Sequence, residues 1–106
     1  MSKYPKPSSW GYVYVIKSSS GLCKIGLTSD VHRRLAELRR DYPSESLVVA
    51  RVIETDNMMW TERQLHSLFS RRHVHGEWFA LMESDFDWID LIERDIKRYL
   101  DLFREG

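Results

Sequence analysis

Hydrophobic and β-branched residues gather in runs that alternate with polar, loop-forming segments. Three of these runs are rich in Val, Ile, Leu and Tyr, residue types that favour strands. They cover residues 12–17, 22–27 and 47–53. The Ser-Ser-Ser-Gly segment at 18–21 is typical of a hairpin loop, because Gly21 accepts a positive φ without steric cost. A shorter aromatic run at 77–81 predicts one further extended piece.

Three other segments show the spacing of amphipathic helices. In the first, Val31, Leu35 and Leu38 recur at i, i+4 and i+7, which places them on one helical face. This helix should end before Pro43, since the residue preceding a proline avoids helical backbone. The predicted helices run from Thr28, Ser29 or Asp30 as the cap to about Arg40, from Thr55 or Asp56 to about Arg71, and from Ser84 onward.

The elements therefore follow the order β-β-α-β-α-(β)-α, which predicts a small α/β layer fold with helices packed on a sheet. A chain of 106 residues has the size of one domain. Residues 1–9 contain no hydrophobic run, so we expect a flexible arm rather than a signal peptide. Residues 83–106 form the amphipathic last helix, which we expect to pack on the domain made by residues 10–82.

The composition is that of a globular protein, with 42% hydrophobic and 30% charged residues, and it argues against disorder. No apolar run approaches the roughly 18 residues that cross a bilayer, so no membrane partner is expected. Cys23 is the only cysteine in the sequence. It cannot form an intrachain disulfide, and a lone thiol suits a reducing compartment such as the cytoplasm.

Charge is distributed unevenly, although the net formal charge is zero. Residues 1–82 contain 12 Lys and Arg against 8 Asp and Glu, a net of +4, whereas residues 83–106 contain 4 against 8, a net of −4. A neutral protein with a basic face still attracts a polyanion, because the local field decides. The candidate nucleic-acid-binding residues are Arg33, Arg39, Arg40, Arg71 and Arg72. The alternative for Arg39 and Arg40 is that they only solvate a helix surface.

Tyr14 and Lys24 lie on neighbouring predicted strands and bring a phenol and an ammonium into the same hairpin. They stand opposite each other if the connecting loop has three or five residues, whereas an even loop places Tyr14 opposite Ile25. Next to Lys24, a tyrosine with an ordinary pKa of about 10 would lose its proton more readily and become a better general base. The alternative is a tyrosine packed on the sheet and an exposed lysine.

The second predicted helix places Glu62 and His66 on a face with Leu65 and Phe69. A carboxylate near an apolar stripe needs a charged partner or a metal ion. One carboxylate with water and substrate phosphate suits Mg²⁺, which keeps much of its hydration. The alternatives are that Glu62 pairs with an arginine at the edge of the stripe and that His66 is a hydrogen-bonded helix histidine.

Arg34 flanks the apolar stripe of the first predicted helix, where its guanidinium can lean over the hairpin. A planar, always charged fork suits a phosphate oxygen and the charge that develops on it during transfer. Arg33 is the competing residue, but it points more toward solvent. Gly26, within a strand, indicates a place where backbone or ligand approaches the sheet closely.

Together these residues resemble the GIY-YIG nuclease superfamily, and above all its small phage-type branch, often described as a DNA-binding domain. The likeness extends from Gly11 to about Leu81. The strings that carry it are Gly11-Tyr12-Val13-Tyr14-Val15-Ile16, Lys24-Ile25-Gly26-Leu27-Thr28, Arg33-Arg34-Leu35, Glu62-x-x-x-His66-x-x-Phe69 and Gly76-Glu77-Trp78-Phe79.

The resemblance implies an α/β (α+β) domain with a central three-stranded antiparallel sheet flanked by three helices, and metal-assisted cleavage of phosphodiester bonds. By position, Tyr14 matches the general base, Arg34 the helix arginine and Glu62 the single metal-binding glutamate. The sequence departs from the pattern twice. Lys24 stands where the second motif has a tyrosine, as is common in the phage-type branch, and the late asparagine of the family has no counterpart after Asn57.

The first functional hypothesis is a DNA endonuclease that depends on Mg²⁺, or on Mn²⁺ in its place. Its candidate catalytic residues are Tyr14, Lys24, Arg34, Glu62 and His66, with Glu62 as the metal ligand. The second hypothesis is a DNA-binding module that has lost cleavage, and the third is a protein-interaction domain that uses Trp78, Phe79 and the acidic last helix. DNA is the expected partner, with RNA as the alternative and a homodimer compatible with the zero net charge. The expected location is the cytoplasm of a bacterial or phage-infected cell.

Overall fold

The first two strands form the hairpin that the hydrophobic pattern predicts. In the computed structural model, which describes residues 9–105 without the side chains of Phe103 and Glu105, β1 (Gly11–Ser18) pairs antiparallel with β2 (Cys23–Thr28). The turn between them closes with a hydrogen bond from the Ser18 N–H to the Leu22 carbonyl, and Gly21 has a φ of 93°. The arm predicted for residues 1–9 lies, except for Ser9, outside the described residues.

Within residues 9–105 the sheet is antiparallel throughout and has five strands rather than three. Its order is β3-β1-β2-β5-β4, so that β3 (Leu47–Thr55), β1 and β2 are the predicted central strands. The two additional strands are β4 (His73–His75) and β5 (Trp78–Phe79), and Gly76 at a φ of 52° lies in the turn between them. Strands of two and three residues are too short to show a periodic pattern, which is why the sequence indicated only one extended piece there.

Three α-helices complete the predicted α+β domain. The first, α1 (Val31–Asp41), begins at one of the predicted caps, because the Asp30 side chain accepts a hydrogen bond from the Arg33 N–H. The second, α2 (Met58–Leu68), begins later and ends earlier than predicted. Asn57 caps it in place of Thr55 or Asp56, since Thr55 is the last residue of β3, and a 3₁₀ turn (Ser70–Arg72) replaces its last turn.

The third helix, α3 (Glu83–Glu105), begins one residue before the predicted Ser84 cap. The side chain that satisfies its start is Asp85, which accepts the Met82 N–H at 2.7 Å. The same carboxylate oxygen of Asp85, a 7%-exposed residue, accepts from Arg72 Nε at 3.1 Å. Asp85 therefore joins the start of α3 to the turn that leads into β4 and β5.

We predict that Asp85→Ala lowers the free energy of unfolding by about 2 kcal/mol, because a buried acceptor of one backbone and one charged donor is lost. Urea denaturation followed by circular dichroism would measure the change. Asp87→Ala, at an exposed position of the same helix, is the matched control and should lie within about 0.5 kcal/mol of the wild type. Equal stability of the two variants would contradict this role for Asp85.

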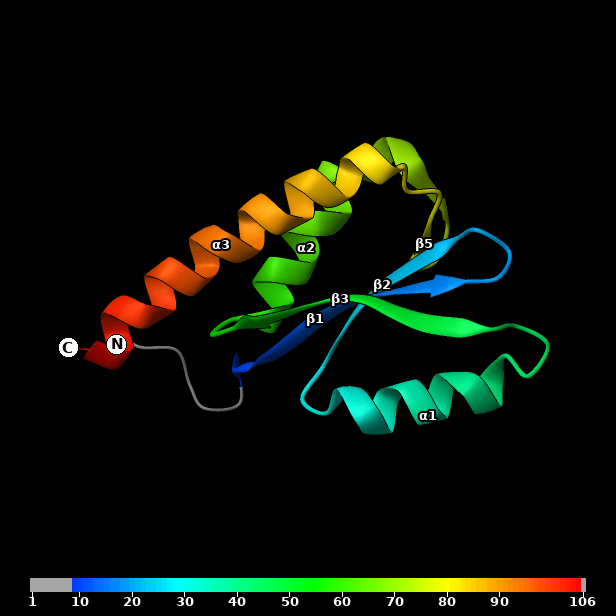
Figure 1. The fold of residues 1–106 in the computed structure, drawn as a ribbon, viewed down its shortest axis with the longest axis horizontal. Helices are drawn as coiled ribbons and strands as arrows, with labels where there is room; N and C mark the ends of the chain where they lie inside the picture. The colour runs from blue at the N-terminus through cyan, green and yellow to red at the C-terminus, as the bar shows by residue number, and fades with distance from the viewer. Residues whose placement is uncertain (1–8, 106) are drawn as a thin grey trace.

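The sheet has a hydrophobic core on each face. On one face α2 and α3 cover a cluster that includes Val13, Ile25, Leu65 and Ile89, and on the other α1 covers a smaller cluster that includes Tyr14. Figure 1 shows this division, with α1 on one side of the sheet and α2 and α3 on the other. Alternate residues of β1 therefore face different helices.

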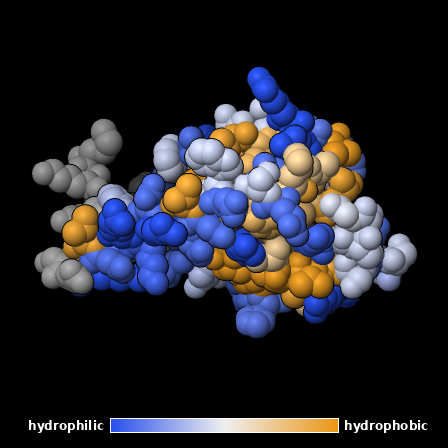
Figure 2. Space-filling model, turned by 45° about the horizontal axis from the view of Figure 1, so that its top comes forward, coloured by the Kyte–Doolittle hydropathy of each residue, from blue (hydrophilic) through white to orange (hydrophobic). Residues whose placement is uncertain are grey.

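The long helix α3 is fastened to β3 by charged side chains as well as by its apolar stripe. Arg51 forms two hydrogen bonds with Asp90, at 2.7 and 3.3 Å, and Arg104 binds Glu54 at 2.8 Å. In Figure 2 the narrow end of the molecule, which contains the C-terminal half of α3, is mainly hydrophilic, whereas hydrophobic residues gather over the broader part. Among the described residues, no helix has both the length and the apolar character that a membrane span requires.

Candidate active site

Side chains from both faces of the sheet meet along the side of β2 that lies next to β5, where the pairing with β5 ends. The short strand β5 pairs with only two residues of β2, and its alignment ends where the Ile25 N–H donates to the Glu77 carbonyl at 3.0 Å. The Ile25 carbonyl bonds instead with His66 Nε2 of α2, at 2.8 Å. Because a carbonyl only accepts, Nε2 carries the proton. The backbone of Ile25 is therefore bonded to Glu77 through its N–H and to His66 of α2 through its carbonyl.

Glu62, His66 and Glu77 meet at this edge. One ligand atom from each of the three side chains lies within 4.8 Å of the others. Glu62 Oε2 is buried and has no hydrogen-bond partner. Burial, followed by the negative charge of Glu77, raises the pKa of Glu62 above its ordinary value of 4.5. An unpaired carboxylate oxygen beside a second carboxylate and an imidazole is a set of donor atoms that could hold a divalent cation.

Lys24 is the cation that this cluster does contain. Its Nζ lies 3.1 Å from Glu77 Oε1 and 5.6 Å from the centre of the Trp78 ring. The Lys24 side chain is only 10% exposed, so the alternative of an exposed strand lysine is wrong. The pairing of Lys24 with Trp78 across β2 and β5 places Glu77, the residue before Trp78, within its reach.

Tyr14 faces Arg34 rather than Lys24. The hairpin register places Tyr14 opposite Gly26 and Lys24 opposite Ile16, two residues away from the predicted pairing. Neither predicted register is therefore right, because the turn is centred on Ser20. This is one residue later in the chain than the pairing of Tyr14 with Lys24 assumed, and half a residue later than the pairing of Tyr14 with Ile25 assumed. Tyr14 and Lys24 still share the α1 face of the sheet.

The ionisation of Tyr14 is governed by burial. Burial raises the pKa of the Tyr14 phenol above its ordinary value of 10.0, and its interaction with the Arg34 side chain opposes that rise. Glu77 and Glu62 add negative potential that raises the same pKa further. Interaction with Tyr14 raises the pKa of Arg34. The predicted help from Lys24 is thus wrong: the cation that favours the phenolate is Arg34, and burial outweighs it.

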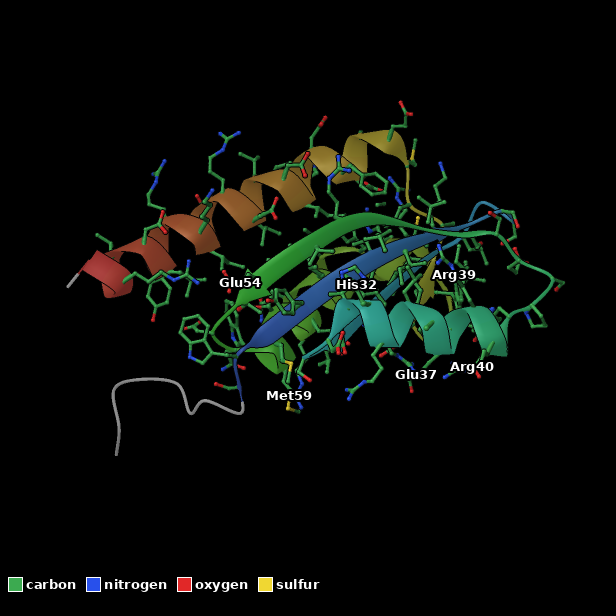
Figure 3. The ribbon with its side chains drawn as sticks, turned by 60° about the horizontal axis from the view of Figure 1, so that its bottom comes forward. His32, Glu37, Arg39, Arg40, Glu54 and Met59 are labelled. Atoms are coloured by element: carbon green, nitrogen blue, oxygen red, sulfur yellow. The ribbon has the colours of Figure 1, made fainter. Side chains whose placement is uncertain are left out.

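The five candidate catalytic residues occupy one region of the structure, while the five candidate DNA-binding arginines are dispersed. Arg33 is exposed and lies 4.0 Å from Glu37. Arg39 donates to the Leu47 carbonyl at 3.1 Å, which ties α1 to the start of β3. Figure 3 shows Arg39 on the sheet side of α1 and Arg40 on the outer side. Arg71 is exposed, whereas Arg72 is held by Asp85.

Sequence reasoning missed Glu77. Its signal was present in the string Gly76-Glu77-Trp78-Phe79, in which Glu77 itself was given no role. Only the pairing of β5 with β2 reveals that this glutamate reaches Lys24 and Glu62. The same pairing buries Trp78 and Phe79, which are 6% and 1% exposed, so a protein-interaction surface made of these two aromatic residues is excluded.

Comparison with known proteins identifies a matching domain family. A model of the T5orf172 domain matches residues 11–102, which include every residue of the cluster described above. No curated protein and no solved structure matches the chain.

Proposed function

Because the chain belongs to the T5orf172 domain family, a nuclease-like family of phage type, we propose that it is a metal-dependent endonuclease of the GIY-YIG type that hydrolyses phosphodiester bonds in DNA. The observation that carries this proposal is the cluster at the edge of β2. It joins an unpaired buried carboxylate oxygen of Glu62 to His66 and Glu77, and it adjoins the Tyr14–Arg34 pair on the α1 face.

The residues of the cluster fit a divalent cation. Glu62 Oε2 has a lone pair and no donor, and hard carboxylate oxygens are the ligands that Mg²⁺ and Mn²⁺ prefer. His66 donates through Nε2 to the Ile25 carbonyl, which leaves Nδ1 as the ring nitrogen without a backbone partner. A nitrogen ligand favours Mn²⁺ over Mg²⁺. A bound divalent cation would supply positive charge to the phosphate and its leaving oxygen.

Arg34 and Tyr14 have separate roles in the proposed reaction at the phosphate. Arg34 offers a planar guanidinium to the non-bridging oxygens, where negative charge increases during transfer. In this proposal Tyr14 takes the proton of the attacking water. Because burial raises the pKa of its phenol above 10.0 despite the interaction with Arg34, Tyr14 needs the additional positive charge of a metal-loaded cluster to act as a base.

We predict metal-dependent cleavage by the wild-type chain and its loss in Arg34→Ala. The rate should fall about 1,000-fold, the size expected when one preorganised stabiliser of transition-state charge is removed. Supercoiled plasmid, single-stranded DNA and RNA, incubated with Mg²⁺, Mn²⁺ or chelator, would show which nucleic acid is cut. Arg98→Ala, at an exposed position of α3, is the control. Undiminished cleavage by Arg34→Ala would assign the activity to a contaminant.

A DNA-binding module without cleavage is the second candidate. It is favoured by the exposed arginines Arg33, Arg40 and Arg71 and by Lys24, which takes the place of a tyrosine in the second motif. Binding of this kind requires no metal, and its affinity falls steeply with salt as phosphates are neutralised. Salt-dependent binding in chelator, together with no product from any substrate in Mn²⁺, would establish this candidate and overturn the first.

A further inference from the structure

We propose that Glu77 is a ligand of the divalent cation, and that Lys24 is the counter-ion that holds Glu77 until the cation displaces it. The inference rests on the proposed function only for the presence of a metal. Its structural basis is the ion pair between Lys24 Nζ and Glu77 Oε1 at 3.1 Å, in which the lysine side chain is 10% exposed. Glu77 belongs to the same three-residue group as Glu62 and His66.

The geometry of the group is close to that of a coordinated ion. Ligands bound to one cation at about 2.1 Å lie roughly 3.0 Å apart when adjacent and roughly 4.2 Å apart when opposite. The ligand atoms of Glu62, His66 and Glu77 lie within 4.8 Å of one another. Only a small contraction would therefore bring all three onto one ion, and two of the three are held in place: His66 by the Ile25 carbonyl and Glu77 by Lys24.

The charges explain why a cation competes with Lys24. Two carboxylates face each other, and the one ammonium present is bonded to Glu77 while Glu62 Oε2 has no partner. A divalent cation between the carboxylates neutralises both, and it repels the Lys24 ammonium at the same time. Lys24 then carries a charge without a partner on the sheet face that it shares with Tyr14, where a phosphodiester would supply the missing negative charge.

Competition makes a prediction that a supporting role for Lys24 does not. If the Lys24 ammonium competes with the cation for the Glu77 carboxylate, Lys24→Met should bind Mn²⁺ at least about fivefold more tightly. The substitution removes both the competing ion pair and the repulsion between the ammonium and the metal ion. If Lys24 only positions Glu77, the same variant should bind Mn²⁺ equally or more weakly. Glu77→Gln should bind it at least about tenfold more weakly, because an anionic ligand is lost.

Isothermal titration of the full chain with Mn²⁺, without nucleic acid, is the experiment. Lys17→Met, at an exposed lysine of β1, and Glu83→Gln, at an exposed glutamate of α3, are the controls and should match the wild type. Lys24→Arg keeps the positive charge and should bind within about twofold of the wild type. Circular dichroism melting identifies any variant that fails to fold, and in that case Lys24→Gln takes the place of Lys24→Met.

Nuclear magnetic resonance of the Lys24 ammonium protons gives a second measurement, which needs only the wild-type chain. A lysine that is bonded to Glu77 and 10% exposed should show a protected ammonium signal, and added Mg²⁺ should abolish that protection. A signal that is unchanged at saturating Mg²⁺, or Lys24→Met with unimproved Mn²⁺ affinity, overturns the inference. If either of these results were found but the chain still cleaved DNA in a metal-dependent way, only this inference would fail and the nuclease proposal would be unaffected. If the titrations gave the expected affinities but no DNA were cleaved, the nuclease proposal would fail and this inference would be unaffected.

Discussion

Glu62→Gln is expected to abolish metal-dependent cleavage and, at the same time, to raise the melting temperature of the protein at pH 7.5. The loss of cleavage should be at least about 1,000-fold, because an anionic ligand of the cation is replaced by a neutral one. The gain in stability has a separate cause. Glu62 Oε2 is buried without a partner, and a charged oxygen in that position disfavours the folded state.

The pH dependence of this stability gain follows from the raised pKa of Glu62. Burial and the charge of Glu77 raise that pKa above 4.5, so between 4.5 and the folded-state pKa the folded chain binds more protons than the unfolded chain. Wild-type stability from this group therefore falls as the pH rises through that interval. Below pH 4.5 the carboxyl is protonated in both states, and the difference between wild type and Glu62→Gln should disappear.

Thermal melts of wild type and Glu62→Gln at pH 4, 6 and 7.5, in chelator, would measure the effect. Glu83→Gln, at an exposed position, is the control, and at pH 7.5 its melting temperature should differ from that of the wild type by less than the melting temperature of Glu62→Gln does. A Glu62→Gln variant that is less stable at pH 7.5, or whose gain persists unchanged at pH 4, would show that the carboxylate has a stabilising partner. Such a result would contradict the account of Glu62 as an unsatisfied metal ligand, even if cleavage were lost.

The parts of the fold that are long and periodic could be predicted from the sequence. Strands β1 to β3 and helix α1 contain enough residues for their hydrophobic pattern to identify them, and Asp30 caps α1 as one of the predicted residues. Short-range chemistry was less informative. Thr55 is a residue type that often caps helices, but its buried hydroxyl is hydrogen-bonded to the Thr61 hydroxyl at 2.8 Å. Thr55 is instead the last residue of β3, and Asn57 is the N-cap of α2.

The site depends on long-range pairing that the sequence does not state. The two predicted registers of the hairpin were wrong by two residues and by one, because serines and a glycine allow several turns of different length and position. Glu77 was missed because its placement depends on a two-residue strand beside β2. The face shared by Tyr14 and Lys24 corresponds to the odd loop, one of two alternatives that the sequence left open, because a shift of two residues leaves the alternation of side chains unchanged.

Gly26→Ala is expected to lower the free energy of unfolding by about 1 to 3 kcal/mol, the usual effect of forcing one extra carbon into a packed core. The hairpin register lays the ring of Tyr14 across Gly26. A Cβ at Gly26 would lie 2.5 Å from Tyr14 Cζ and 3.1 Å from Cε1. Because Tyr14 is 1% exposed and packed beneath α1, its ring cannot move aside without displacing its neighbours.

The same collision should impair cleavage while sparing the metal. Displacement of the Tyr14 ring separates the phenol from Arg34, whereas Glu62 and His66 are carried by α2 and Glu77 is held by Lys24. We therefore expect Gly26→Ala to lose most of its cleavage rate and to keep its Mn²⁺ affinity. A double-mutant cycle tests the cause: in a Tyr14→Leu background, which removes the ring from Gly26, the further change Gly26→Ala should alter stability by less than about 0.5 kcal/mol. Equal destabilisation in both backgrounds would mean that Gly26 is required by its backbone and not by the tyrosine that lies over it.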